Sequence, residues 1–228
     1  MTQQLGKVFY FDLKGKREMK YNFLLNKSIN NIDFKELKPN KPFLFFVKSN
    51  NKDITTYNEG FSVNEIFEIN STGFISSNDE LNISFTKEEQ KSKISDLLSM
   101  QENLWRIKYK TPKDVGDWKY LSALNDVMKN NKESNLIEVS YRPFDKRWSL
   151  YTGSSRGLYS RARSKVTRHL LKQNNLGLVI GRQGQAVGTM AWNLCFITNE
   201  ITDCNMFYRG GAMLFPLYLY QNKTLYLI

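Results

Sequence analysis

Cysteine and histidine are scarce in this sequence of 228 residues, which has two cysteines and one histidine. Because a conventional structural zinc site needs four Cys or His ligands, this chain alone cannot supply one. Cys195 and Cys204 lie among apolar and small residues, so we expect both thiols to be reduced and buried. His169 has no Ser or Cys partner in a recognisable catalytic motif. We therefore expect it on the surface of a helix rather than in an active site.

Long apolar runs are also missing. No window approaches about 18 uninterrupted apolar residues, the minimum for a membrane-spanning helix. The N-terminus, MTQQLGKVFYFDLKGKRE, has no basic region followed by an apolar one. The sequence therefore predicts neither a membrane span nor a signal peptide, and we expect a cytoplasmic location. With 41% hydrophobic and 14% aromatic residues, the chain has enough apolar side chains for a sizeable core.

Acidic residues are nearly absent between Tyr141 and Arg182, where Asp145 is the only one. This stretch holds ten of the 33 Lys and Arg residues, so it carries +9 of the formal net charge of +11. Seven of the ten are Arg, whose planar guanidinium can bind a phosphate or a guanine edge with two hydrogen bonds. Aromatic residues are interleaved among them, a pattern typical of nucleic-acid contact. The alternative is a solvated basic face, or a subunit interface that pairs with acids elsewhere.

Catalytic motifs are missing as well. The sequence has no [DNS]-P-P-[YFW] run for methyl transfer to an amino nitrogen, and no Gly-rich loop for a methyl donor or nucleotide. The segment GRQGQAVG lacks the Lys of a phosphate-binding loop. Asp12, Glu18 and Lys20 are residue types found in metal-dependent nucleases, but their spacing is too short and puts Glu18 and Lys20 on different faces of a helix. We therefore predict no catalytic residue, metal site or cofactor site in this chain.

Hydrophobic periodicity predicts a mixture of strands and helices in residues 1–135. Lys7–Leu13 and Phe43–Val47 read as buried strands, and a short amphipathic helix follows the first of them. Thr86–Glu89 is a capping box that predicts the start of a helix. A second helix is predicted after Asp114 from one apolar stripe: Trp118, Leu121, Leu124 and Val127 or Met128.

A polar linker at Asn130–Asn135 is the candidate domain boundary, and the residues after it are richer in strands. A short basic helix is predicted at Ser164–Lys172. The predicted strands are Leu136–Tyr141, Arg147–Tyr151, Leu176–Ile180, Trp192–Thr198 and Phe215–Tyr220. The fold class is therefore α+β, with mixed strands, a few short helices and a β-rich second half.

Several of these segments resemble one enzyme family. The run YRPFDKR at Tyr141–Arg147, with Trp148, Tyr151, the element SRAR at Ser160–Arg163, Gly181–Gln183 and the run PLYLY ending at Tyr220, is similar to the C-terminal specificity region of type ISP restriction-modification enzymes. These enzymes join nuclease, helicase, adenine-N6 methyltransferase and target-recognition parts in one polypeptide. This sequence has Ala162 where the family often has Pro, lacks the methyltransferase motifs and stops soon after PLYLY.

The resemblance implies a fragment of a larger fold. Residues 1–135 would be the connector that follows a methyltransferase core, and residues 136–228 would be a target-recognition region truncated at its C-terminal end. The implied partners are double-stranded DNA and the methyltransferase core of the same system. S-adenosylmethionine is expected for the methyltransferase part, and no cofactor for this chain.

The resemblance and the charge pattern together predict a DNA-binding surface. Arg156, Arg161, Arg163, Lys165 and Arg168 are expected to neutralise phosphates, and Arg182 and Gln183 to read base edges. The full predicted set also includes Arg142, Lys146, Arg147 and Tyr159. Arg142 and Asp145 have an alternative role, pairing with each other to hold a turn, and Trp148 and Tyr151 are expected in the core. The alternative for the whole stretch is a protein-interaction domain that docks onto the methyltransferase or another subunit.

Overall fold

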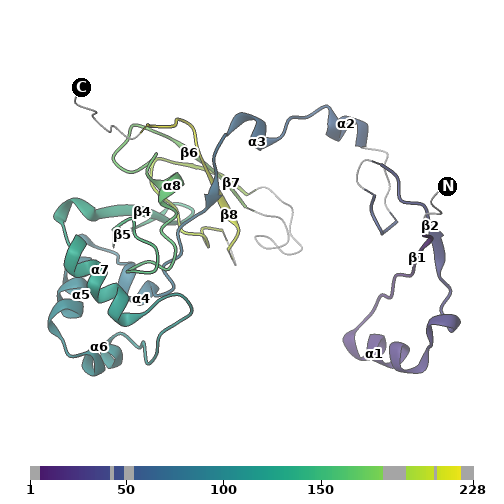
Figure 1. The fold of residues 1–228 in the computed structure, drawn as a ribbon, viewed down its shortest axis with the longest axis horizontal. Helices are drawn as coiled ribbons and strands as arrows, with labels where there is room; N and C mark the ends of the chain where they lie inside the picture. The colour runs from purple at the N-terminus through teal and green to yellow at the C-terminus, as the bar shows by residue number, and fades with distance from the viewer. Residues whose placement is uncertain (1–5, 42–43, 49–53, 182–193, 208–209, 222–228) are drawn as a thin grey trace. The chain divides into compact units, whose positions relative to one another are not determined.

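The computed structural model describes residues 6–41, 44–48, 54–181, 194–207 and 210–221. The chain divides into two compact units, Met1–Phe61 and Ser62–Ile228. The polar linker at residues 130–135 therefore lies inside the second unit. Figure 1 shows the elements of both units.

The first unit is built on a two-stranded antiparallel sheet. Strand β1 (Val8–Tyr10) pairs with β2 (Lys35–Leu37), and helix α1 (Arg17–Asn26) lies between them in the sequence. Phe11 stacks on Phe23, with ring centroids 5.5 Å apart. The strand predicted at 43–47 is not found in its described part, where Leu44 has a φ of 50°. Helix α2 (Ile54–Asn58) ends the unit.

None of the residues in this unit whose burial is described is buried. Large apolar side chains such as Leu25, Ile29 and Phe46 are instead exposed. A two-stranded sheet with short helices is too small to cover its own apolar residues. The first unit therefore contributes no hydrophobic core in its described part.

The second unit begins with helices, and Figure 1 shows α4 to α7 grouped near the hairpin of β4 (Leu136–Arg142) and β5 (Asp145–Leu150). The predicted N-cap at Thr86 is confirmed, because its Oγ1 accepts a hydrogen bond from the Glu89 N–H at 3.1 Å and helix α5 follows. The Glu89 carboxylate reaches back to the Phe85 N–H at 3.0 Å rather than to Thr86, so the capping box is only half formed. Helix α6 was not anticipated. The helices of this part are α3 (Val63–Ile66), α4 (Asp79–Asn82), α5 (Lys87–Ser99), α6 (Glu102–Lys108) and α7 (Tyr120–Asn130).

Helix α7 buries only part of the predicted stripe, because Val127 is fully buried and Leu124 packs against the core while other members of the stripe are exposed. Trp118 is fully buried but lies before the helix, in a bridge with Val115. The buried residues within α7 include Tyr120, Ala123 and Val127. Leu121 and Met128, which the stripe placed in the core, are 64% and 67% exposed.

The strands form two antiparallel arrangements. Strands β4 (Leu136–Arg142) and β5 (Asp145–Leu150) make a hairpin with a register shift between Ser140 and Arg142. A four-stranded sheet has the order β3-β8-β6-β7. Its strands are β3 (Ser71–Thr72), β6 (Gly177–Gly181), β7 (Cys195–Thr198) and β8 (Ala212–Pro216).

One hydrophobic core joins these elements. It includes Phe74 before α4, Leu97 of α5, Val139 of β4, Tyr159 of the loop after β5 and Leu214 of β8. The predicted α+β class with a strand-rich second half is confirmed. The predicted helix at 164–172 is shorter, because α8 spans only Ser164–Thr167. No helix in the described part of the chain is long and apolar enough to cross a membrane.

Candidate nucleic-acid interface

The bases of the Tyr141–Arg182 stretch fall into two groups. The first group lies on the β4–β5 hairpin and is ion-paired. Arg147 donates to both carboxylate oxygens of Asp145, with Nε–Oδ1 at 2.5 Å and Nη2–Oδ2 at 2.8 Å. This pairing with Arg147 lowers the pKa of Asp145. The guanidinium of Arg147 also lies 3.4 Å from the centre of the Phe85 ring.

Arg142 pairs with an acid far away in the sequence. Its Nη1 lies 3.0 Å from Oδ1 of Asp203, which is only 1% exposed. The predicted partner, Asp145, is instead held by Arg147, so the predicted Arg142–Asp145 pair is wrong. Burial and the neighbouring Asp79 raise the pKa of Asp203 to about 6, while Arg142 acts in the opposite direction. Arg142 therefore has a structural role as the ion-pair partner of a buried carboxyl group.

Lys146 completes the hairpin group through an ion pair with Glu200. Glu200 also accepts hydrogen bonds from Thr198 and Ser140. Burial alone would raise the pKa of Glu200, but these two hydrogen bonds and the one from Lys146 outweigh burial, so the pKa is lowered. Three of the predicted DNA-contacting residues are thus neutralised within the fold: Arg142, Lys146 and Arg147.

The second group lies in what we call the basic segment, residues 155–172, which contains no acid. Its bases are Arg156, Arg161, Arg163, Lys165, Arg168 and Lys172. All are exposed except Arg163, which is half-buried. Arg161 forms an ion pair with Asp117 at 3.5 Å, and both side chains are about half exposed. The basic segment therefore presents most of its charge to solvent.

Buried groups hold the basic segment in place. The backbones of Arg161 and Ile75 exchange hydrogen bonds of 2.9 and 3.1 Å. Tyr151 donates from its hydroxyl to the carbonyl oxygen of Ala162, and the Ala162 N–H donates to Oγ of Ser155 at 3.0 Å. Tyr151 is buried, as expected, and Trp148 is half-buried. The exposed bases thus project from a backbone that is fixed to the core.

Tyr159 does not belong to the surface. It is 0% exposed, it lies edge-on to Phe74 with ring centroids 5.2 Å apart, and it shares a hydrogen bond with Ser149. The prediction that Tyr159 contacts DNA is therefore wrong. The sequence placed it there because it stands between two arginines, and periodicity carries no information in an irregular loop.

His169 is buried rather than on the helix surface. Its Nδ1 accepts a hydrogen bond from the Tyr220 N–H at 2.8 Å, which links the segment after α8 to the chain near its C-terminus. Burial, followed by the charge of Arg168, lowers the pKa of His169. The ring is therefore neutral near pH 7 and has a structural role. Both cysteines are free, as expected, but Cys195 is exposed and only Cys204 is buried.

The predicted base readers, Arg182 and Gln183, lie outside the described residues. The acids that neutralise the hairpin, Asp203 and Glu200, were not identified from the sequence. They stand 61 and 54 positions from their partners, so no local spacing points to them.

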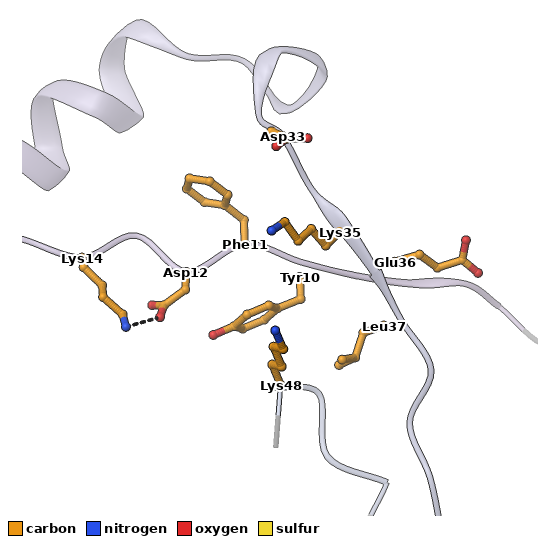
Figure 2. Close-up of a pocket in the computed structure, with 9 residues that line it drawn as sticks. All are labelled: Tyr10, Phe11, Asp12, Lys14, Asp33, Lys35, Glu36, Leu37 and Lys48. Atoms are coloured by element: carbon orange, nitrogen blue, oxygen red, sulfur yellow. Dashed lines mark ion pairs between the residues drawn. The ribbon is translucent and has the colours of Figure 1, made fainter. Parts of the chain in front are cut away.

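The first unit contains a cavity of ≈ 670 Å³ (Figure 2). Asp12 lies there, but it pairs with Lys14 at 3.2 Å, and Glu18 and Lys20 do not line the cavity. Across the described residues, no group of His, Cys, Asp and Glu is arranged to hold a metal ion. The residues that line the cavity are Tyr10, Phe11, Asp12, Lys14, Asp33, Lys35, Glu36, Leu37 and Lys48.

Comparison with known families matches residues 65–226 to the type ISP C-terminal specificity domain. The chain belongs to this family. The match covers most of the second unit, including the β4–β5 hairpin and the basic segment. The resemblance drawn from YRPFDKR and PLYLY is thereby confirmed. No curated protein matches the chain significantly.

Solved structures share the fold of this specificity domain. The ATP-dependent type ISP restriction-modification enzyme LlaBIII bound to DNA has a TM-score of 0.62 and 20% identity over 96% of this chain. A nuclease-deletion mutant of the type ISP enzyme LlaGI with a DNA substrate mimic has a TM-score of 0.60 and 19% identity over 97%. A cryo-EM structure of a DrdV–DNA complex has a TM-score of 0.57 and 13% identity over 94%. The chain spans 15%, 19% and 23% of these three chains respectively.

Proposed function

We propose that this specificity domain recognises double-stranded DNA for an adenine-specific type ISP restriction-modification enzyme, and that the basic segment makes the phosphate contacts. The observation that carries the proposal is the solvent exposure of most bases in the acid-free basic segment, on a backbone that hydrogen bonds fix to the core of a domain of this family. The three structural neighbours are described as DNA complexes, which supports the same assignment.

The phosphate contacts would come from Arg156, Arg161, Arg163, Lys165 and Arg168. Such contacts fix the position of a protein on DNA and make its affinity depend on salt, but they carry no sequence information. Arg182 and Gln183 remain proposed base readers. Residues 136–228 would hold the recognition surface, and residues 1–135 would lead from the methyltransferase core. S-adenosylmethionine would be bound by that core, not by this chain, and the location would be cytoplasmic.

A second candidate function is a protein-interaction domain, in which the basic segment docks onto the methyltransferase core or another subunit. The first unit exposes many large apolar side chains for its size, and this favours a protein contact that would cover them. Such a contact is compatible with DNA binding by the second unit. The two functions differ in what the basic segment binds.

A paired replacement separates these functions. Arg161→Ala with Arg163→Ala should weaken binding to duplexes of any sequence. It should also reduce the slope of log K against log[salt] by about 2, since each phosphate contact contributes roughly 0.9. The control is Lys129→Ala with Lys132→Ala, which removes the same charge from exposed positions outside the segment. Equal slopes in both double variants would assign the basic segment to a protein contact.

A further inference from the structure

The tip of the β4–β5 hairpin carries an exposed aromatic residue in an unfavourable backbone conformation. Pro143 and Phe144 form the turn between Arg142 and Asp145, and we call these two residues the hairpin tip. Phe144 is 92% exposed and has a φ of 62°. Pro at the first central position and a positive φ at the second are features of a type II turn, which favours Gly or Asn at the second position. Phe is neither small nor polar, so its presence is not explained by turn stability.

The fold holds this tip rigidly. All three bases around it are ion-paired: Arg147 with Asp145, Arg142 with Asp203 and Lys146 with Glu200. The backbones of Ser140 and Asp203 are joined by a hydrogen bond of 3.0 Å, which anchors the start of the tip to the segment after β7. An exposed side chain on a clamped two-stranded ribbon is positioned in advance for contact with something outside the molecule.

The surroundings of the tip suit a flat aromatic group. Phe196 of β7 lies edge-on to Phe144, with ring centroids 5.2 Å apart and planes at 83°. A recess of ≈ 540 Å³ lies between the tip and residues 196–200. Since the neighbouring bases are neutralised by acids, the tip offers an aromatic face rather than a site for phosphate.

We propose that Phe144 stacks on nucleobases that are unstacked when this domain binds DNA. This inference rests on the proposed DNA-binding function and adds a second contact, separate from the basic segment. A two-stranded ribbon fits a DNA groove, and apolar side chains inserted at base steps unstack and bend the duplex. Aromatic stacking tolerates any base, because every base has a π face. A protein partner for the tip would be an apolar contact without preference for opened base pairs.

The test compares two duplexes that are identical except for one mismatched pair at the centre, where unstacking costs less. The full chain should bind the mismatched duplex more tightly than the intact one. Phe144→Asn should lose about tenfold in affinity for the mismatched duplex and bring the ratio of the two Kd values close to one. Its salt slope should be unchanged, because no phosphate contact is lost. Phe144→Trp should keep the preference.

Thermal unfolding checks that a loss of affinity in Phe144→Asn does not come from a destabilised fold. Phe144→Asn loses the contact with Phe196 but relieves the positive φ, so its unfolding temperature should stay close to that of the natural chain. Leu121→Gln, an exposed apolar residue of α7, is the control and should keep the wild-type ratio of Kd values. A ratio unaffected by Phe144→Asn would overturn the stacking proposal and assign the tip to a protein contact, while a steep salt slope would leave the proposed function intact. No binding to either duplex would overturn both.

Discussion

The carboxyl group of Asp203 has neighbours with opposite effects on its charge. Arg142 favours the ionised form, while burial and Asp79 favour the protonated form and prevail. The pKa is raised from 3.8 to about 6, so the folded protein holds this proton more tightly than the unfolded chain does. The resulting stabilisation is fully present below pH 3.8 and is lost as the pH rises through 6.

Lowering the pH from about 7 to about 5 should therefore raise the contribution of Asp203 to the free energy of unfolding by roughly 1 kcal/mol. Urea unfolding of the natural chain and of Asp203→Asn at both pH values measures this change, because Asn does not titrate. Asp145 and Glu200 have lowered pKa values and stay ionised over this range. Parallel pH dependence in the two proteins would show that Asp203 titrates normally.

Residues in this chain were predictable where their partners are close in the sequence. Thr86 and Glu89 lie three positions apart, and the N-cap hydrogen bond between them was read correctly. Arg142 was assigned to Asp145 because the sequence offers no sign that Asp203 lies beside it. Burial of Tyr159 depends on Phe74, which comes from a distant segment. Charge density located the basic segment but did not separate its exposed bases from the ion-paired bases of the hairpin.

Helix α7 is connected through one buried acid to the loop after β5 and to the start of the basic segment. Asp126 is 8% exposed. Its Oδ2 accepts hydrogen bonds from Oγ1 of Thr152 at 2.7 Å and from the Leu158 N–H at 2.9 Å. A Cβ at Gly157 would lie 2.3 Å from the same oxygen, so only glycine allows this close approach. The loop after β5 and the start of the basic segment are thus positioned by a helix that precedes them.

Asp126→Ala should leave the buried Leu158 N–H without an acceptor and lower the free energy of unfolding by about 2 kcal/mol. The Leu158 amide should also exchange with solvent faster, which hydrogen exchange measures directly. Asp117→Ala is the control, since that carboxyl is about half exposed and its loss should change stability by no more than about 0.5 kcal/mol. Unchanged exchange at Leu158 would show that Asp126 does not hold the loop.

Elements were predicted best where their period is unbroken. Strands β4, β5 and β6 were found within two residues of their observed ends. The stripe predicted for α7 was right at Val127 and wrong at Leu121, because Trp118 was counted as helical although the helix begins at Tyr120. Without Trp118 as a reference, Tyr120, Ala123 and Val127 form the buried helical face, and Leu121 lies on the exposed face. Helix boundaries of this kind depend on the turn before the helix, which propensities describe poorly.

The two units of the chain differ in what stabilises them. The second unit has an extended core, whereas no residue described in the first unit is buried. Amides opened by local fluctuation exchange fastest where few apolar contacts resist opening. Hydrogen exchange should therefore be much faster across α1 and β1 than across α5 and β4. Similar protection in both units would show that the first unit is stabilised by something other than buried apolar contacts among its described residues.

The positive charge of the chain is concentrated in one stretch. Of the formal net charge of +11, a local excess lies in Tyr141–Arg182, and the structure leaves the basic segment as its solvent-facing part. This charge lies within the residues that match the type ISP C-terminal specificity domain. If this charge binds DNA, the salt dependence of the affinity has a predictable size, because counterion release scales with the number of phosphates contacted.

The most direct measurement is the affinity of the full chain for a random-sequence duplex and for the matching single strand across a salt series. Four or five phosphate contacts predict a slope of log K against log[salt] of about −4 for the duplex, with tighter binding to the duplex than to the single strand. A slope near zero, or no binding at any salt concentration, would contradict DNA contact by the basic segment.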